Sequence, residues 1–94
     1  MKTVKILVSG RVQGVFFRVY AREFARRFSD VTGYVKNLRD GRVEIYAEGS
    51  EESLLKLARW AKEEGSPASQ VSSTEEIWGD SISKREYQDF KITY

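Results

Sequence analysis

The segment Gly10–Arg18, GRVQGVFFR, holds the residues best suited to bind an anion. It lies between a strand-like and a helix-like stretch, so its backbone N–H groups can converge where the helix dipole also favours negative charge. Gly14 can adopt the positive φ that such a nest of amides often needs. Arg18, in the first turn of the expected helix, can direct its guanidinium at two oxygens of a phosphate. By themselves, these residues fit a phosphate cradle and a plain turn with a surface arginine equally well.

Cysteine and histidine are both absent from the chain. Their absence excludes a disulfide framework, a thiolate nucleophile and a zinc knuckle. It also excludes a Ser–His–Asp triad and acid–base catalysis by imidazole. An enzyme of this composition must work with arginine, lysine, asparagine, hydroxyl groups, carboxylates and backbone amides.

Length, composition and charge indicate one small domain over residues 1–94, with a monomer as the default. A hydrophobic content of 40% is enough for one two-layer core. No apolar run approaches the roughly 18 residues of a membrane span, and we see no signal peptide, so we expect a cytoplasmic protein without a membrane segment. The 16 basic and 14 acidic residues are interspersed, which argues against a nucleic-acid partner.

Hydrophobic periodicity predicts the elements on either side of the loop and a hairpin after them. A strand over Thr3–Ser9 precedes the loop, and a helix over Phe17–Phe28 follows it. Strands over Thr32–Leu38 and Arg42–Glu48 are joined by a tight turn, since Asp-Gly readily supplies a positive φ. Four acidic residues are predicted to lie on a solvated face or edge of the sheet rather than to form a catalytic carboxylate pair: Glu44, Glu48, Glu75 and Glu76.

The second half of the chain repeats the pattern of helix and strand. Ser50 is the expected N-cap of a helix that ends near Glu64, and strands follow over Gln70–Trp78 and Asp89–Thr93. The order β-α-β-β-α-β predicts an α+β, ferredoxin-like sandwich: an antiparallel sheet, two helices on one face and a short extra C-terminal strand. The larger aromatic side chains are expected to pack within this fold: Tyr34, Tyr46, Trp60 and Trp78.

Two motifs resemble the signatures of one enzyme family. GRVQGVFFR resembles the loop signature of the acylphosphatases, and Gly33–Glu44 resembles their second signature, GxVxNxxxGxVE. The resemblance continues through Gly65-Ser66-Pro67 and Phe90–Tyr94, so it covers nearly the whole chain. It implies an enzyme that hydrolyses the carboxyl–phosphate bond of acyl phosphates, with inorganic phosphate as product and expected competitive inhibitor.

The resemblance also assigns roles to residues. It makes Arg18 the arginine that binds phosphate and Asn37 the residue that positions the attacking water. The remaining phosphate contacts fall to the backbone amides of the loop: Gln13, Gly14, Val15, Phe16, Phe17 and Arg18. The leaving group is a carboxylate, whose conjugate acid has a pKa of ~4, so it departs without a strong acid and the missing histidine is no obstacle. No metal and no cofactor is implied.

Two positions depart from the commonest family pattern. Position 16 is often small in relatives, so Phe16 is expected not to need a glycine-like backbone, and to crowd the cradle or face the core. The stretch Phe28–Thr32 is one residue longer than usual. We expect the loop between helix and strand to absorb the extra residue, because a shifted register would turn Asn37 to the other side of the sheet.

Two non-catalytic interpretations compete with the enzyme. An RNA-recognition domain shares the fold but stacks bases on aromatic residues in the middle of its strands, whereas Phe16 and Phe17 lie in a loop. A regulatory anion sensor would keep the phosphate cradle without turnover. Acetyl phosphate, carbamoyl phosphate and 1,3-bisphosphoglycerate are all candidate substrates of the enzyme.

Overall fold

The chain forms seven elements in the order that its periodicity predicts. The computed structural model describes residues 1–94. The elements in chain order are β1 (Lys2–Arg11), α1 (Phe17–Ala25), β2 (Thr32–Asn37), β3 (Val43–Gly49), α2 (Glu51–Glu63), β4 (Gln70–Gly79) and β5 (Phe90–Ile92). The predicted α+β sandwich, with its extra C-terminal strand, is confirmed.

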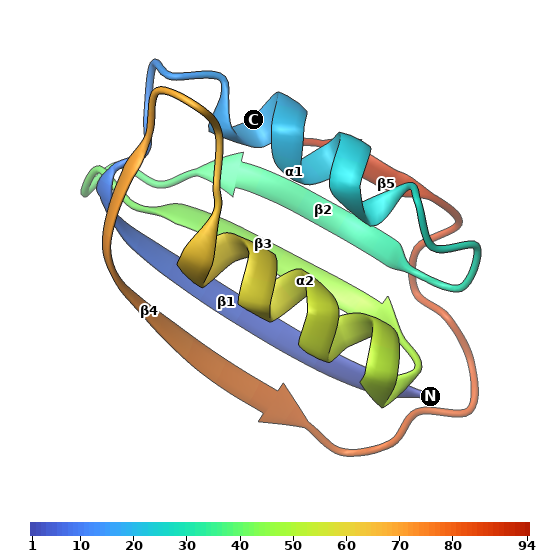
Figure 1. Ribbon diagram of the computed structural model, residues 1–94. Coiled ribbons are helices and arrows are strands. Elements are labelled where there is room, and N and C mark those ends of the chain that lie inside the picture. The colour runs from blue at the N-terminus through green and yellow to red at the C-terminus, as the bar shows by residue number, and fades with distance from the viewer.

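All five strands belong to one sheet, in the order β4-β1-β3-β2-β5. The neighbours β1–β3, β1–β4 and β2–β3 are antiparallel as predicted, whereas the extra strand β5 runs parallel to β2, so the sheet is mixed and not antiparallel throughout. Both helices lie on the same face of the sheet (Figure 1). Neither helix has the length and apolar character that crossing a membrane would take.

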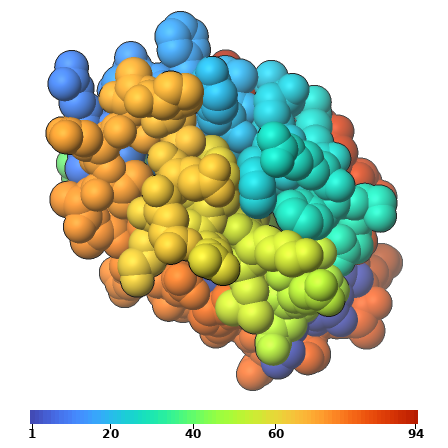
Figure 2. Space-filling view, viewed as in Figure 1, coloured from blue at the N-terminus to red at the C-terminus, as the bar shows by residue number.

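The core lies between the sheet and the two helices. Ile6 of β1 faces Ile45 of β3 in the antiparallel register, and both are fully buried against Leu54 and Leu57 of α2 and their neighbours. The helices and their connecting segments cover the middle of this face, and the mostly exposed β4 stays in view along one edge (Figure 2). Trp60 of α2 packs on Phe17, with ring centroids 5.3 Å apart, and so holds the first turn of α1 in place.

The first helix is shorter than the predicted span of Phe17–Phe28. It ends at Ala25, because the backbone N–H groups of Arg27 and Phe28 donate to carbonyls only three residues back. Phe28 still packs edge-on against Phe24, at 5.5 Å between ring centroids. The apolar spacing that predicted a longer helix is therefore preserved by a tighter turn.

The predicted start of the second helix is confirmed in detail. The Ser50 hydroxyl accepts from the N–H of Ser53 at 3.2 Å, as an N-cap should. Asp30 strengthens this cap from the α1–β2 loop, because its carboxylate accepts from the N–H of Ser50 at 2.9 Å and the hydroxyl of Ser53 at 3.0 Å. At the other end, Gly65 has φ 63° and its N–H donates to the Trp60 carbonyl.

The prediction of a solvated site for Glu44 and Glu48 is wrong. Glu44 is buried, and Glu48 is 0% exposed although it lies on the sheet face that bears no helix. The segment before β5 crosses this face, and its backbone N–H groups at Glu86 and Tyr87 donate to the Glu48 carboxylate. The Tyr46 hydroxyl donates to the same carboxylate at 2.9 Å. Glu48 therefore anchors a segment distant in sequence.

Three partly exposed tyrosines pack together beside these carboxylates, in keeping with the packing role expected of Tyr34 and Tyr46. The rings of Tyr34, Tyr46 and Tyr87 lie 5.5–5.6 Å apart. The pKa values of the Tyr34 and Tyr46 hydroxyls are raised, first by burial and then by their hydrogen bonds to Glu44 and Glu48. Trp78, by contrast, stays partly exposed on β4.

Candidate active site

A cavity of about 410 Å³ lies beside the N-terminal end of α1. Both residues singled out by the sequence, Arg18 and Asn37, line it together with Gly14, Phe16 and Phe17 of the loop. The remaining lining residues are apolar or aromatic: Val12, Val19, Ile92 and Tyr94. The fold thus brings the loop, the end of β2 and the C-terminal residues to one point.

Strand register determines where Asn37 points. Asn37 pairs with Val43 of β3 and lies two residues after Val35, which is fully buried under the helices. Side chains alternate along a strand, so Asn37 shares the helix-covered face with Val35. The segment between Ala25 and Thr32 accommodates its full length as a series of turns. Asn37 consequently stays on the side of the sheet where Arg18 lies.

The loop offers a run of unused hydrogen-bond donors. None of the backbone N–H groups from residue 13 to residue 19 donates a hydrogen bond within the chain. The last three belong to the first turn of α1, where helix geometry leaves them without a carbonyl partner. Gly14 has φ 74°, the left-handed conformation expected of a nest. Such free donors at a helix start suit a phosphate.

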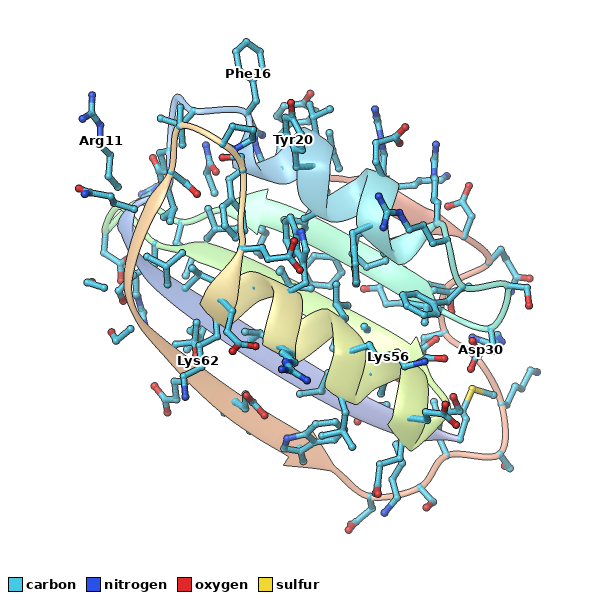
Figure 3. The ribbon with its side chains drawn as sticks, viewed as in Figure 1. Arg11, Phe16, Tyr20, Asp30, Lys56 and Lys62 are labelled. Atoms are coloured by element: carbon cyan, nitrogen blue, oxygen red, sulfur yellow. The ribbon has the colours of Figure 1, made fainter.

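Phe16 contradicts the backbone expectation for this position, and of the two expected orientations it lines the cavity rather than facing the core. Its φ of 61° makes it the one non-glycine residue with a positive φ, so the position does adopt the glycine-like conformation. A left-handed backbone costs an L-residue roughly 1–2 kcal/mol. The side chain is 74% exposed, so it does not face the core, and it projects from the loop beyond the N-terminal end of α1 (Figure 3).

The guanidinium of Arg18 has no carboxylate partner in the chain. Its central carbon lies 5.0 Å from the centroid of the Tyr94 ring, over which it stacks. A partly buried arginine with an aromatic surface on one side keeps its N–H groups available for an anion. Among the residues that line the cavity, Arg18 is the one with a formal positive charge.

Gln13 and Val15 do not line the cavity, although both were expected among the phosphate-binding residues. The Gln13 side chain is committed elsewhere, because its Nε2 donates to the carbonyls of Leu38 at 2.7 Å and Arg42 at 2.9 Å. The Val15 carbonyl accepts from the Ser66 hydroxyl at 2.7 Å. These two residues hold the loop in place through their side chain and carbonyl, and only their N–H groups remain for a ligand.

Ser66 is a residue that the sequence did not single out as part of the site. It is 1% exposed and its hydroxyl supports the loop from the segment after α2. Its only signal in the sequence was its position beside Gly65 and Pro67, within a stretch that resembles the family. No group of three or more acidic side chains is arranged to share a metal ion.

One cavity of this α+β sandwich is lined by the first loop with its free amides, by Arg18, which has no carboxylate partner, and by Asn37 at the end of β2. Such a cavity suits a small anion. The chain belongs to the acylphosphatase family, whose model matches residues 4–92. It is therefore a hydrolase that cleaves acyl phosphates to a carboxylate and inorganic phosphate, as the named relatives indicate. The RNA-recognition and sensor interpretations are set aside.

Relatives in sequence and structure agree with this assignment. The chain is 48% identical over 95 residues to an acylphosphatase of Shewanella amazonensis, covering 99% of this chain and 98% of the relative. It is 40% identical to acylphosphatase-2 of Bos taurus, covering 100% and 94% respectively. The crystal structure of acylphosphatase from Bacillus subtilis superimposes with a TM-score of 0.90 at 39% identity, over 100% of both chains.

Proposed function

We propose that Arg18 and Asn37 carry out the hydrolysis within this one cavity. The phosphoryl group of the substrate lies against the loop amides from Gln13 to Arg18, and the Arg18 guanidinium binds two of its oxygens. The Asn37 side-chain amide holds a water in line with the bond to be broken. The observation that carries the proposal is that Arg18 and Asn37, from different elements, line the same cavity as the loop.

The chemistry requires no more than these groups supply. The water oxygen forms a bond to phosphorus while the bond from phosphorus to the acyl oxygen breaks, and the carboxylate leaves with the electron pair. Because a carboxylate is a weak base, it needs no proton from the enzyme. The amides and Arg18 stabilise the charge on the phosphoryl oxygens, and Asn37 orients the water. Asn37 is no base, so the proton of the water passes to the phosphate or to solvent.

Three further properties belong to the same proposal. Inorganic phosphate is a competitive inhibitor, because it is the product that the cradle releases. The enzyme acts as a monomer. It acts in the cytoplasm on a small molecule, with no nucleic-acid partner, in keeping with a net charge of only +2.

Release of phosphate from benzoyl phosphate tests the assignment of both residues. Arg18→Ala is expected to abolish turnover and inhibition by phosphate together. Asn37→Ala is expected to lower kcat and leave phosphate inhibition nearly intact, because it removes the contact to the water. Arg22→Ala is the matched control, since Arg22 lies one turn further along α1 and does not line the cavity. Normal kcat in both test variants would sink the assignment.

A further inference from the structure

The cavity is lined by polar side chains where it is partly buried and by apolar or aromatic side chains where it is exposed. Its polar side chains, Arg18 and Asn37, are partly buried. The three exposed side chains that line it are apolar or aromatic: Phe16, Val19 and Tyr94. Its volume of about 410 Å³ is many times the roughly 30 Å³ that one water occupies, so it has room for more than a phosphate group.

Phe16 serves no evident purpose in the folded chain itself. Its ring makes none of the aromatic or cation contacts found in the protein, and it is not packed on the core. It sits nonetheless at a strained backbone position, where an exposed polar residue or glycine would be better tolerated. Strain of this kind is commonly found where a residue contacts a ligand.

We infer that Phe16 is a specificity-determining residue, whose ring contacts the acyl group of the substrate and favours aromatic or bulky apolar acyl groups over small ones. This inference rests on the proposed function, because a phosphoryl group held by the loop is what places the acyl group beside Phe16. The acyl group is bonded to that phosphoryl group through a single oxygen, so it must extend past the exposed lining side chains. Tyr94, stacked over Arg18, offers a second aromatic surface there.

The contact acts on binding rather than on the chemical step. The acyl group lies outside the phosphoryl centre and changes little between ground state and transition state. Phe16 therefore stabilises both states about equally, which lowers KM for an aromatic substrate and leaves its kcat nearly unchanged. An acetyl group is too small to cover the ring and gains little from it.

The test compares benzoyl phosphate with acetyl phosphate in the full chain. In Phe16→Ala, the benzoyl-to-acetyl ratio of kcat/KM is expected to fall about 3- to 10-fold, mainly through a higher KM for benzoyl phosphate. Any disturbance of the loop amides affects both substrates and cancels in the ratio. Phe16→Tyr keeps the ring and should keep the ratio. Tyr20→Ala is the matched control, since Tyr20 is 45% exposed on α1, the helix that follows Phe16, but does not line the cavity (Figure 3).

Two results would overturn the inference. One is an unchanged benzoyl-to-acetyl ratio of kcat/KM in Phe16→Ala. The other is an equal fall of this ratio in Tyr20→Ala, which would show that the effect is not specific to Phe16. A different result would contradict the proposed function: continued turnover of both substrates in Arg18→Ala. Equal losses of kcat/KM for both substrates in Phe16→Ala leave the ratio unchanged. They would show that Phe16 supports the loop and does not determine specificity.

Discussion

The Nε2 atom of Gln13 donates a hydrogen bond of 2.7 Å to the carbonyl oxygen of Leu38, the residue directly after Asn37. A second bond, to the Arg42 carbonyl at 2.9 Å, spans the base of the hairpin turn. The loop expected to hold phosphate is thus tied to the strand end that carries Asn37. One side-chain amide therefore links the loop directly to the end of β2.

Replacing Gln13 should therefore lower activity more than stability. Gln13→Ala is expected to reduce kcat about 10-fold or more, because the loop and Asn37 lose their common anchor. The free energy of unfolding should fall by only about 1 kcal/mol, since the Leu38 and Arg42 carbonyls keep other partners. Steady-state kinetics and urea unfolding measure the two effects. Gln70→Ala is the control on exposed β4, and unchanged kcat in Gln13→Ala would contradict the anchoring role.

Replacing Glu48 should destabilise the fold strongly. Glu48→Gln is expected to lower the free energy of unfolding by about 2–3 kcal/mol, because one oxygen that accepts backbone N–H groups becomes a donor. For a domain of this size that corresponds to a fall in Tm of about 10 °C or more. Glu75→Gln, exposed on β4, is the matched control. Equal Tm values for the two variants would show that the anchor is dispensable.

Asp30 should make stability depend on pH at acid values. Burial acts to raise the pKa of its carboxyl, but hydrogen bonds from Ser50 and Ser53 outweigh burial and lower it. A folded-state pKa below the unfolded one means that the carboxylate stabilises the fold at all pH values above its unfolded pKa of about 3.9. That stabilisation is lost as the pH falls through the lower, folded-state pKa.

The variant Asp30→Asn isolates this effect. At a pH of about 7 its free energy of unfolding should be about 1 kcal/mol below that of the unchanged protein. The difference should shrink towards zero as the pH falls through the folded-state pKa of the native carboxyl, because the native carboxyl then becomes protonated as well. Urea unfolding at several pH values measures it. If the difference in free energy of unfolding stays constant as the pH falls, the charge of Asp30 contributes nothing and only the shape of its side chain matters.

Phosphate should stabilise the protein through Arg18. At about 100 times its Kd, a ligand specific to the folded state adds roughly 2.7 kcal/mol to the free energy of unfolding. Thermal unfolding in inorganic phosphate, with chloride at equal ionic strength as reference, should show a rise in Tm. Asn37→Ala should keep this rise and Arg18→Ala should lose it. A rise that persists in Arg18→Ala would move the phosphate site elsewhere.

Patterns local in sequence predicted most of the fold. The alternation of Val4, Ile6 and Val8 identified the buried face of β1, and Ser50 and Gly65 marked the ends of α2. These signals depend on neighbours within a few residues, so the chain reveals them without its tertiary structure. Arg18 and Asn37 became candidate site residues through the two motifs, and the register of β2 brings Asn37 to the cavity that Arg18 of α1 also lines.

The misjudged residues depend on partners far away in the chain. Alternation assigned Glu48 to the face without helices, but could not reveal that residues 86 and 87 cover it. The anchoring of Gln13 by the hairpin and of Val15 by Ser66 is equally non-local. The backbone of Phe16 was misjudged because a left-handed conformation is rare for a bulky residue, and the surrounding loop must impose it.

The strand order also bears on the time course of folding. β5 pairs with β2, and β1 lies between β3 and β4, so most neighbours in the sheet are distant along the chain. Closing such long loops before any contact forms slows the search, which favours refolding in milliseconds to seconds. Ile92 and Tyr94, in and just after the last strand, line the cavity. Recovery of catalytic turnover during refolding should therefore coincide with completion of the sheet.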